Sequence, residues 1–181
     1  MEPVSVTRCV KPHDAAVNQL VGFADASTVA YGCCIYLRSI DTQGKVHVEL
    51  LCSKSRINPL RKQLTIPRLE LNAALLLSEL TTKVHNTLST TTKVDNSYLF
   101  SDSQIVLAWL NTDVTKLQAY VANRVRAIQE LTHSCHWQYV HTASNPADCL
   151  SRGLQPHELK YDNAWWHGPS FLHEMNYNFQ S

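Results

Sequence analysis

The order of strand-like and helix-like segments restricts the fold of this chain more than any other feature. Three β-rich apolar runs, residues 20–25, 30–38 and 46–53, come first. The sequence DTQG at residues 41–44, between the last two runs, is favourable turn chemistry. These segments therefore predict three consecutive antiparallel strands.

A long segment rich in leucine, alanine and glutamate follows, after a predicted loop at residues 54–59. Residues 67–88 predict a helix of about five or six turns, with the Thr65 hydroxyl as its cap and Pro67 in its first turn. The remaining predicted elements are a strand at 96–101, helices at 103–110 and 116–131, a strand at 135–141, and a helix that starts at 145–148. The order β-β-β-α-β-α-α-β-α predicts an α/β fold, a mixed sheet with helices on its faces.

Length and composition fit a folded domain. The chain has 181 residues, of which 44% are hydrophobic and 17% charged, so a disordered chain is excluded. We expect a linker at 1–18, one domain at 19–153 and an aromatic-rich tail at 154–181. The net charge of +1 gives no global positive field, so any contact with nucleic acid needs a local patch or metal ions.

The cysteines and the N-terminus indicate where such a chain works. None of the six cysteines forms a C-x-x-C pair, which argues against a zinc site. Cys33 and Cys34 are adjacent in a predicted strand, point to opposite faces and are poorly placed to bond each other. Buried free thiols, no apolar signal core and no apolar run that could cross a bilayer predict an intracellular protein, cytoplasmic or nuclear.

Four acidic residues lie at junctions between predicted elements. Asp25 ends the first strand, Glu70 lies in the first turn of the long helix, Asp102 follows the fourth strand and Asp148 opens the last helix. Strand ends and helix starts meet at one rim of an α/β sheet, so these acids could converge. Carboxylates that converge repel one another unless cations are present, and Mg²⁺ prefers oxygen ligands.

Each acid also has an ordinary interpretation. Asp25 could cap a turn, and Asp102 and Asp148 could cap helices. Glu70 near a helix N-terminus is favoured by the helix dipole. No single acid decides between these interpretations and a metal site. The ordered set, with each acid at the expected junction, favours the metal site.

Several motifs occur in one order with compatible spacing. They are VGFADASTVAYGCCIYLR, LLCSKSRINPLRKQLTIPRLELNAALLL, YLFSDSQIVLAWL, YVANRV, WQYVHTASNPADCLSRG and WWHGPSFL. Over residues 19–172 the chain resembles the ribonuclease H region of Bel/Pao-type LTR retrotransposon polyproteins. The resemblance implies a ribonuclease H-like fold, with a five-stranded mixed sheet of three antiparallel and then two parallel strands.

The resemblance also implies a function. It is the hydrolysis of the RNA strand of an RNA–DNA hybrid during reverse transcription, by an endonuclease that uses two Mg²⁺ or Mn²⁺ ions. By motif, Asp25, Glu70 and Asp102 would hold one ion, and Asp25 and Asp148 the second. Expected partners are the hybrid and adjoining reverse transcriptase and integrase regions of a polyprotein. The family is sometimes labelled a peptidase, but no Asp-Thr/Ser-Gly turn is present around Asp25 or Asp102.

Two features depart from a typical ribonuclease H. His141 lies in the loop before the last acid, seven residues ahead of Asp148, and is a candidate auxiliary residue, although a strand-end histidine with a hydrogen-bonded ring is the simpler interpretation. A separate basic handle helix is not evident. Candidates for contact with nucleic acid are a small residue and six cations: Ser27, Lys54, Arg56, Arg61, Lys62, Arg124 and Arg152.

Two other functions stay open. The domain could be a ribonuclease H fold without turnover that serves as a nucleic-acid-binding domain or scaffold, or it could be a different nuclease or integrase on the same fold. The tail aromatics could stack on bases, pack back on the domain or await a neighbour. They are Tyr161, Trp165, Trp166, Phe171, Tyr177 and Phe179.

Overall fold

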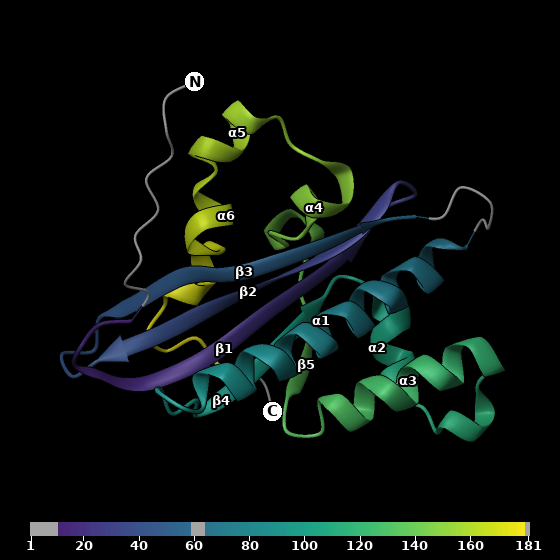
Figure 1. Ribbon diagram of the computed structural model, residues 1–181, viewed down its shortest axis with the longest axis horizontal. Helices are drawn as coiled ribbons and strands as arrows, with labels where there is room; N and C mark the ends of the chain where they lie inside the picture. Colours follow the sequence, from purple (N-terminus) through teal and green to yellow (C-terminus); the bar gives the residue numbers. More distant parts are fainter. Residues whose placement is uncertain (1–10, 59–63, 180–181) are drawn as a thin grey trace.

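The computed structural model describes residues 11–58 and 64–179. Five strands form one mixed sheet in the order β3-β2-β1-β4-β5. The strands are β1 (Ala15–Ala26), β2 (Ala30–Asp41), β3 (Val46–Ile57), β4 (Asn96–Ser101) and β5 (His136–Tyr139). The first three strands pair antiparallel, and β4 and β5 continue parallel to β1, so the predicted fold is confirmed (Figure 1).

Helices fill the connections in the predicted order. They are α1 (Ile66–Leu88), α2 (Gln104–Leu110), η1 (Val114–Lys116), α3 (Ala119–Leu131), η2 (Thr142–Ser144), α4 (Asp148–Arg152), α5 (Pro156–Tyr161), α6 (Asn163–His167) and η3 (Ser170–His173). Thr65 is the N-cap of α1, but its side chain makes no capping hydrogen bond. Within the described residues, no helix has the length and apolar character to cross a membrane.

The three long strands extend beyond their predicted limits. β1 begins at Ala15 rather than Leu20, and β3 runs to Ile57 through residues predicted as loop. The cause is pairing: Ile57 lies opposite Ala30 in the β2–β3 ladder. Polar residues such as those at 54–57 carry no local strand signal, and backbone hydrogen bonds to a neighbouring strand decide their conformation.

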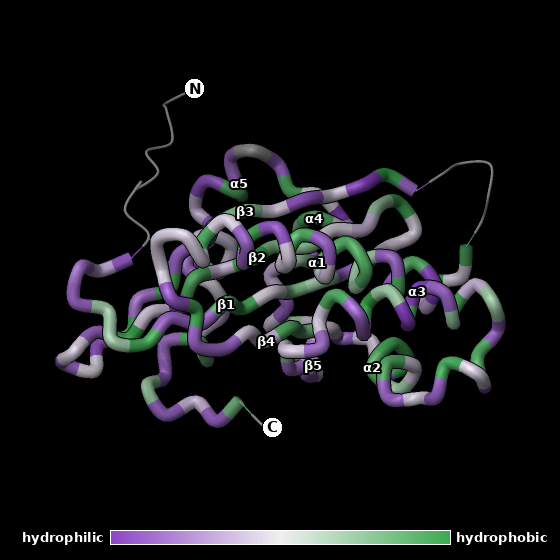
Figure 2. Tube along the Cα trace, turned by 60° about the horizontal axis from the view of Figure 1, so that its bottom comes forward, coloured by the Kyte–Doolittle hydropathy of each residue, from purple (hydrophilic) through white to green (hydrophobic). Residues whose placement is uncertain are grey.

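Helix α1 covers one face of the sheet. Its buried residues, including Leu69, Ala73 and Leu77, pack against Leu20, Cys33 and other side chains of β1 and β2. A second set on α1 contacts α2 and α3, in a cluster with Val106, Val125 and Ile128. Figure 2 shows hydrophobic stretches along the central strands and helices and hydrophilic stretches in the loops. Helix α1 is thereby fixed between the sheet and α3.

The aromatic tail covers the opposite face. Trp165 and Leu172 are buried against a cluster that includes Phe23, Cys34 and Tyr36, and the Tyr36 hydroxyl donates to the Trp165 carbonyl over 2.7 Å. Of the interpretations of the tail, packing back on the domain is the one that describes Trp165. Cys33 and Cys34 belong to opposite faces, as predicted, and both are free thiols.

Arg38, a buried residue of β2, connects the C-terminal tail to the sheet through hydrogen bonds. Its side chain is 1% exposed and donates from Nε to the Leu172 carbonyl and from Nη2 to the Glu174 carbonyl, each over 2.7 Å. Nη1 donates to Gln19 Oε1 over 2.6 Å. All three acceptors are neutral, and burial lowers the pKa of Arg38. A buried cation with these fixed acceptors holds the segment from Leu172 to Glu174 against the sheet.

Candidate metal site

Three of the four predicted acids meet at one rim of the sheet. Asp25 lies near the end of β1, Asp102 follows β4, and Glu70 projects from α1. One carboxylate oxygen from each lies within 4.8 Å of the others. Parallel pairing of β1 with β4 brings the two strand ends together. Glu70 is the fifth residue of α1, just beyond the predicted first turn, because the helix begins at Ile66.

Burial and mutual repulsion raise the pKa values of two of these acids. Burial is the main cause that raises the pKa of Asp25 to about 6, and repulsion from Asp102 and Asp148 adds to it. A hydrogen bond from Ser151 acts in the opposite direction and lowers this pKa. Burial, then repulsion from Asp25 and Asp102, raises the pKa of Glu70 to about 9. Arg152 lowers the pKa of Asp25, but by less than burial raises it, so positive charge does not fully compensate the ionised forms of these carboxyl groups.

The donor set fits a divalent cation. All three ligand candidates are carboxylates, and Oε2 of Glu70 is buried without a hydrogen-bond partner. An ion at this position would supply the missing partner and remove the repulsion. Oxygen-only donors at an open rim are typical of Mg²⁺ or Mn²⁺ sites.

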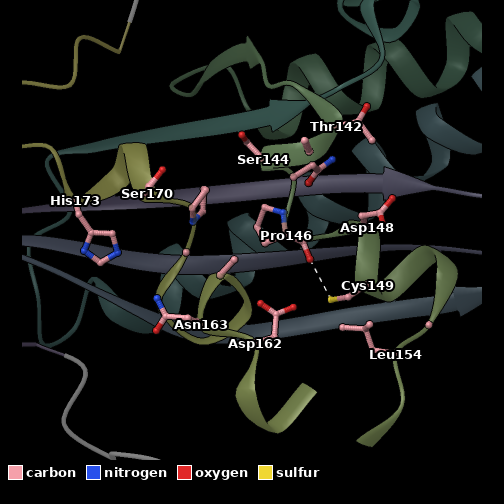
Figure 3. A pocket seen from close by; sticks show the side chains of 16 residues that line it. Thr142, Ser144, Pro146, Asp148, Cys149, Leu154, Asp162, Asn163, Ser170 and His173 are labelled. Carbon is pink, nitrogen blue, oxygen red and sulfur yellow. Dashed lines mark hydrogen bonds between the residues drawn. The ribbon is translucent and has the colours of Figure 1, made fainter. Parts of the chain in front are cut away.

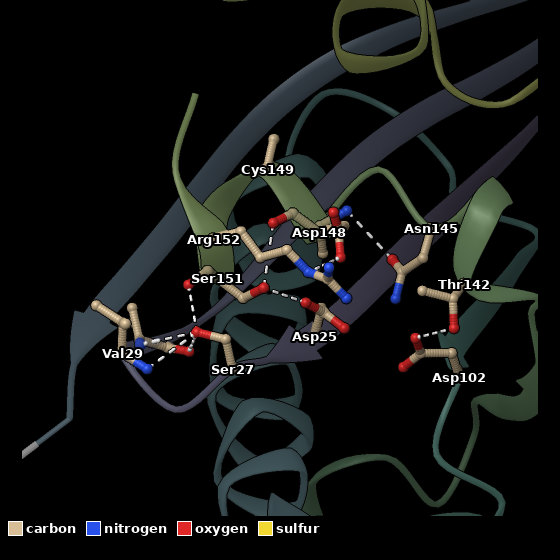
Figure 4. A network of polar contacts seen from close by, with 12 residues as sticks. Asp25, Ser27, Val29, Asp102, Thr142, Asn145, Asp148, Cys149, Ser151 and Arg152 are labelled. Carbon is tan, nitrogen blue, oxygen red and sulfur yellow. Dashed lines mark hydrogen bonds and ion pairs between the residues drawn. The ribbon is translucent and has the colours of Figure 1, made fainter. Parts of the chain in front are cut away.

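Asp148 approaches this group as the first residue of α4. Its proximity contributes to the raised pKa of Asp25, but it is not one of the three acids within 4.8 Å. Its Oδ1 forms an ion pair with Nε of Arg152 over 2.7 Å, one helical turn on. Figure 4 shows Asp148 beside Asp25 on one side, with Asp102 across the rim.

Three contacts anchor α4 to the end of β1. The Ser151 hydroxyl donates to Oδ2 of Asp25, and the Ser151 carbonyl accepts from the Ser27 hydroxyl over 2.6 Å. The Asn145 side chain donates to the Ala24 carbonyl over 3.0 Å. These links, drawn in part in Figure 4, fix Asp148 relative to Asp25.

A glycine makes the close approach of α4 possible. Gly32 lies opposite Asp25 in the β1–β2 ladder. A Cβ on Gly32 would lie 2.6 Å from Cβ of Leu150 and 3.1 Å from the Lys54 carbonyl oxygen. Any other residue there would push α4 outward, because these atoms belong to packed backbone and the start of a side chain.

Asp102 has its own support. The Thr142 hydroxyl donates to Oδ2 of Asp102 over 2.8 Å. Ser103, not Asp102, is the N-cap of α2 and accepts from the Val106 amide. The capping interpretation of Asp102 is therefore wrong, and its carboxylate is available at the rim.

The predicted auxiliary residue and the predicted cations lie on several different elements. His141 is exposed and caps η2, with Nδ1 accepting from the Ala143 amide over 3.2 Å. Lys54 and Arg56 lie on β3 rather than in a loop. Arg124 lies on α3 and Arg152 on α4. Arg61 and Lys62 fall outside the described residues.

Sequence reasoning missed the residues that support the acids. Ser151, Asn145 and Thr142 make the contacts described above. All three lie within the motif WQYVHTASNPADCLSRG, in which only His141, Asp148 and Arg152 were predicted as site residues. Short polar residues that flank a candidate metal ligand are the available signal.

A cleft of about 860 Å³ borders the site without containing the three clustered acids. It lies between the segment from η2 to α4 and the tail, and Thr142, Asp148, Asp162 and His173 are among its lining residues (Figure 3). The tail thus forms one wall of a depression that begins at Asp148.

Comparison with solved structures finds similarity at the level of the fold. The N-terminal RNase H domain of rv2228c from Mycobacterium tuberculosis, solved as a fusion with maltose-binding protein, is similar, with a TM-score of 0.51, 13% identity and coverage of 75% of this chain and 91% of that chain. RNase H1 from Halobacterium salinarum NRC-1 gives a TM-score of 0.46 at 14% identity, over 76% and 96% of the two chains. No curated protein matches significantly.

A viral enzyme also matches. The foamy viral protease-reverse transcriptase, in complex with RNA/DNA hybrid, gives a TM-score of 0.48 at 14% identity, over 84% of this chain and 22% of that chain. The family model described as "Pao retrotransposon-like RNaseH-like domain" matches residues 1–103, more than half of the chain. With its fold and its acidic rim, this chain belongs to the Pao retrotransposon-like RNaseH-like domain family and is an RNase H-like domain of retroelement type.

Proposed function

We propose that this domain is a divalent-metal-dependent endonuclease that cuts the RNA strand of RNA–DNA hybrids during reverse transcription. The observation that carries the proposal is the set of three carboxylates within 4.8 Å at the sheet rim, with Oε2 of Glu70 buried and unpartnered. Family membership supports the same reaction. The partners would be the hybrid and the adjoining reverse transcriptase and integrase regions of a polyprotein.

Asp25, Glu70 and Asp102 would hold one Mg²⁺ or Mn²⁺, and Asp25 with Asp148 a second. When bound, the two ions would activate a water and stabilise the leaving oxygen in phosphodiester hydrolysis. The protein's own contribution is to orient the ligands. Ser151 occupies Oδ2 of Asp25, so the other oxygen of that carboxylate is left for an ion.

Thr142 orients Asp102 in the same way: its hydroxyl donates to Oδ2 of Asp102, which leaves the other carboxylate oxygen for an ion. The Asp148–Arg152 pair is partly exposed, with side-chain exposures of 36% and 66%. Such pairs are weak, so Asp148 can exchange Arg152 for an ion at little cost. His141, exposed beside Thr142, is the proposed auxiliary residue for proton transfer.

The test uses the full chain and a labelled RNA–DNA hybrid. We expect cleavage of the RNA strand in the presence of Mg²⁺ or Mn²⁺, none with a chelator, and none with Asp102→Asn, which keeps the shape of the side chain but removes its charge. Hybrid binding without cleavage under every condition would replace the proposal with a binding or scaffold role. Cleavage of duplex DNA would indicate a different nuclease on the same fold.

A further inference from the structure

A group of arginines lies on the outer surface of α1 and α3, away from the acids. Arg68 in the first turn of α1 and Arg124 on α3 both lie against the ring of Tyr120, with Cζ 5.0 Å and 3.6 Å from its centroid. Asn72 of α1 accepts from Nε of Arg124 over 2.7 Å and from the Tyr120 hydroxyl over 3.1 Å. Arg68, Asn72, Tyr120 and Arg124 are called the arginine cluster below.

A shallow hollow adjoins the arginine cluster. Its volume is about 130 Å³, and its lining includes Tyr31, Arg56, Asn72, Glu79 and Arg124. Arg56 comes from β3 and Arg124 from α3, so segments far apart in the sequence place positive charge on one surface. Glu79 is the single acid in this lining.

The arginines are held in place but not neutralised. None of Arg56, Arg68 and Arg124 forms an ion pair with any residue that the structure describes. Arg124 uses Nε for Asn72 and Nη1 for the Tyr120 carbonyl over 3.2 Å, which leaves Nη2 without a partner in the part of the chain that the structure describes. Arg68 has one long contact, 3.4 Å from Nη2 to Oε1 of Gln118. A guanidinium ordered by an aromatic ring loses little entropy when it binds an anion.

The arginine cluster and Glu70, one of the three clustered acids, lie on opposite sides of the first turns of α1. Arg68 and Asn72 are each two residues from Glu70 in α1. Two residues correspond to a rotation of roughly 200° about the helix axis. Glu70 therefore points to the sheet rim, while Arg68 and Asn72 point outward. The Glu70 side chain is separated from those of Arg68 and Asn72 by about one helix diameter, ~10 Å.

We propose that the arginine cluster and the adjoining hollow bind the phosphodiester backbone of the nucleic acid whose scissile phosphate lies at the carboxylates. This inference rests on the proposed function, and it names a surface that orients the substrate rather than one that reacts. The span of about one helix diameter is short enough for a single hybrid to reach both places. Guanidinium donors such as Nη2 of Arg124 suit phosphate oxygens. With a net charge of only +1, contact with nucleic acid depends on a local surface of this kind or on metal ions.

The test measures binding without turnover. Fluorescence anisotropy of a labelled RNA–DNA hybrid with the full chain, in a chelator, gives Kd across a series of salt concentrations. We expect Arg124→Gln and Arg68→Gln each to weaken binding by about 3- to 10-fold and to lower the slope of log K against log salt by about 1. Arg126→Gln is the matched control, because Arg126 is exposed two residues along the same helix and its loss changes the net charge equally.

Two controls distinguish a loss of hybrid binding from a loss of folding and from a loss of cleavage. Arg124 bridges α1 and α3, so thermal melting of each variant is recorded, and Arg68→Gln tests the surface even if Arg124→Gln does not fold. Salt slopes equal to that of Arg126→Gln for every folded variant overturn the inference. The binding assay contains a chelator, so its result does not depend on cleavage. If the arginine cluster binds hybrid in this assay but the chain never cuts hybrid with Mg²⁺ or Mn²⁺, only the proposed function is refuted.

Discussion

The hydroxyl of Ser151 donates a hydrogen bond to Oδ2 of Asp25, although 126 positions of sequence separate the two residues. Ser151 is 1% exposed and Asp25 is 4% exposed, so water cannot replace the contact. The bond joins the strand that carries one acid to the helix that carries another. It makes the geometry of the rim depend on a residue that cannot itself bind an ion in this arrangement.

Ser151→Ala should therefore weaken divalent-ion binding while the fold is retained. Groups that orient a metal ligand typically contribute about 10- to 100-fold in affinity or activity, and the lost hydrogen bond to a buried carboxyl group should lower the free energy of unfolding by about 1–3 kcal/mol. Mn²⁺ binding followed by electron paramagnetic resonance, together with urea denaturation, measures both effects. Ser55→Ala, at an exposed position of β3, is the control; equal Mn²⁺ affinities in the two variants would refute this role.

The pKa values of the rim acids predict a pH-dependent stability in the absence of metal. Folding raises the pKa of Asp25 from 3.8 to about 6 and that of Glu70 from 4.5 to about 9. The folded state then binds more protons than the unfolded state, so stability that is full below pH ~4 is lost as pH rises through ~6 and ~9. In a chelator, we expect the free energy of unfolding to fall between pH 5 and pH 9 by at least about 1 kcal/mol.

Glu70→Gln removes the larger of these two titrations. Its metal-free stability should change less with pH than that of the unmodified chain and should exceed it at pH 9, whereas Mg²⁺ should stabilise only the unmodified chain. Urea denaturation at pH 5, 7 and 9 gives the comparison. Glu130→Gln, at an exposed site on α3, should keep the original pH profile. A flat profile for the unmodified chain in chelator would contradict the raised pKa values.

Gly32→Ala tests how closely α4 must approach the sheet. The added Cβ would meet Cβ of Leu150 at 2.6 Å, so α4 and Asp148 must shift. Overpacking of this kind costs about 1–3 kcal/mol, and we expect hybrid cleavage to fall together with stability. Thermal melting and a cleavage assay below the melting range measure the two effects. A melting temperature and a cleavage activity equal to those of the unmodified chain would show that α4 can accommodate an added Cβ at this position.

Arg38→Lys tests the attachment of the tail. The charge is kept, but a single ammonium group cannot reproduce three donors aimed at Gln19, Leu172 and Glu174. We expect the free energy of unfolding to fall by about 2–4 kcal/mol, with increased binding of a hydrophobic dye as the tail leaves the sheet. Arg126→Lys, on the surface of α3, should change neither quantity. An unaltered stability for Arg38→Lys would mean that apolar contacts alone hold the tail.

The sequence by itself determined the order of the elements and the places of the acids. Alternating and helical periodicities are local signals, and they located the strands, the long helix and the junctions at Asp25, Glu70, Asp102 and Asp148. The element limits were less certain, because residues 54–57 become strand only through pairing with β2. Local chemistry also allowed Asp102 as the cap of α2, whereas the cap in the structure is Ser103.

Only the tertiary structure decided which groups meet. The contact of Ser151 with Asp25, the capture of the tail by Arg38, and the stacking of Arg68 and Arg124 on Tyr120 all join distant segments. No periodicity encodes such contacts, because they depend on strand register and on how closely helices pack against the sheet. The acids could be named from the sequence, but the groups that orient them became visible only when the chain was folded.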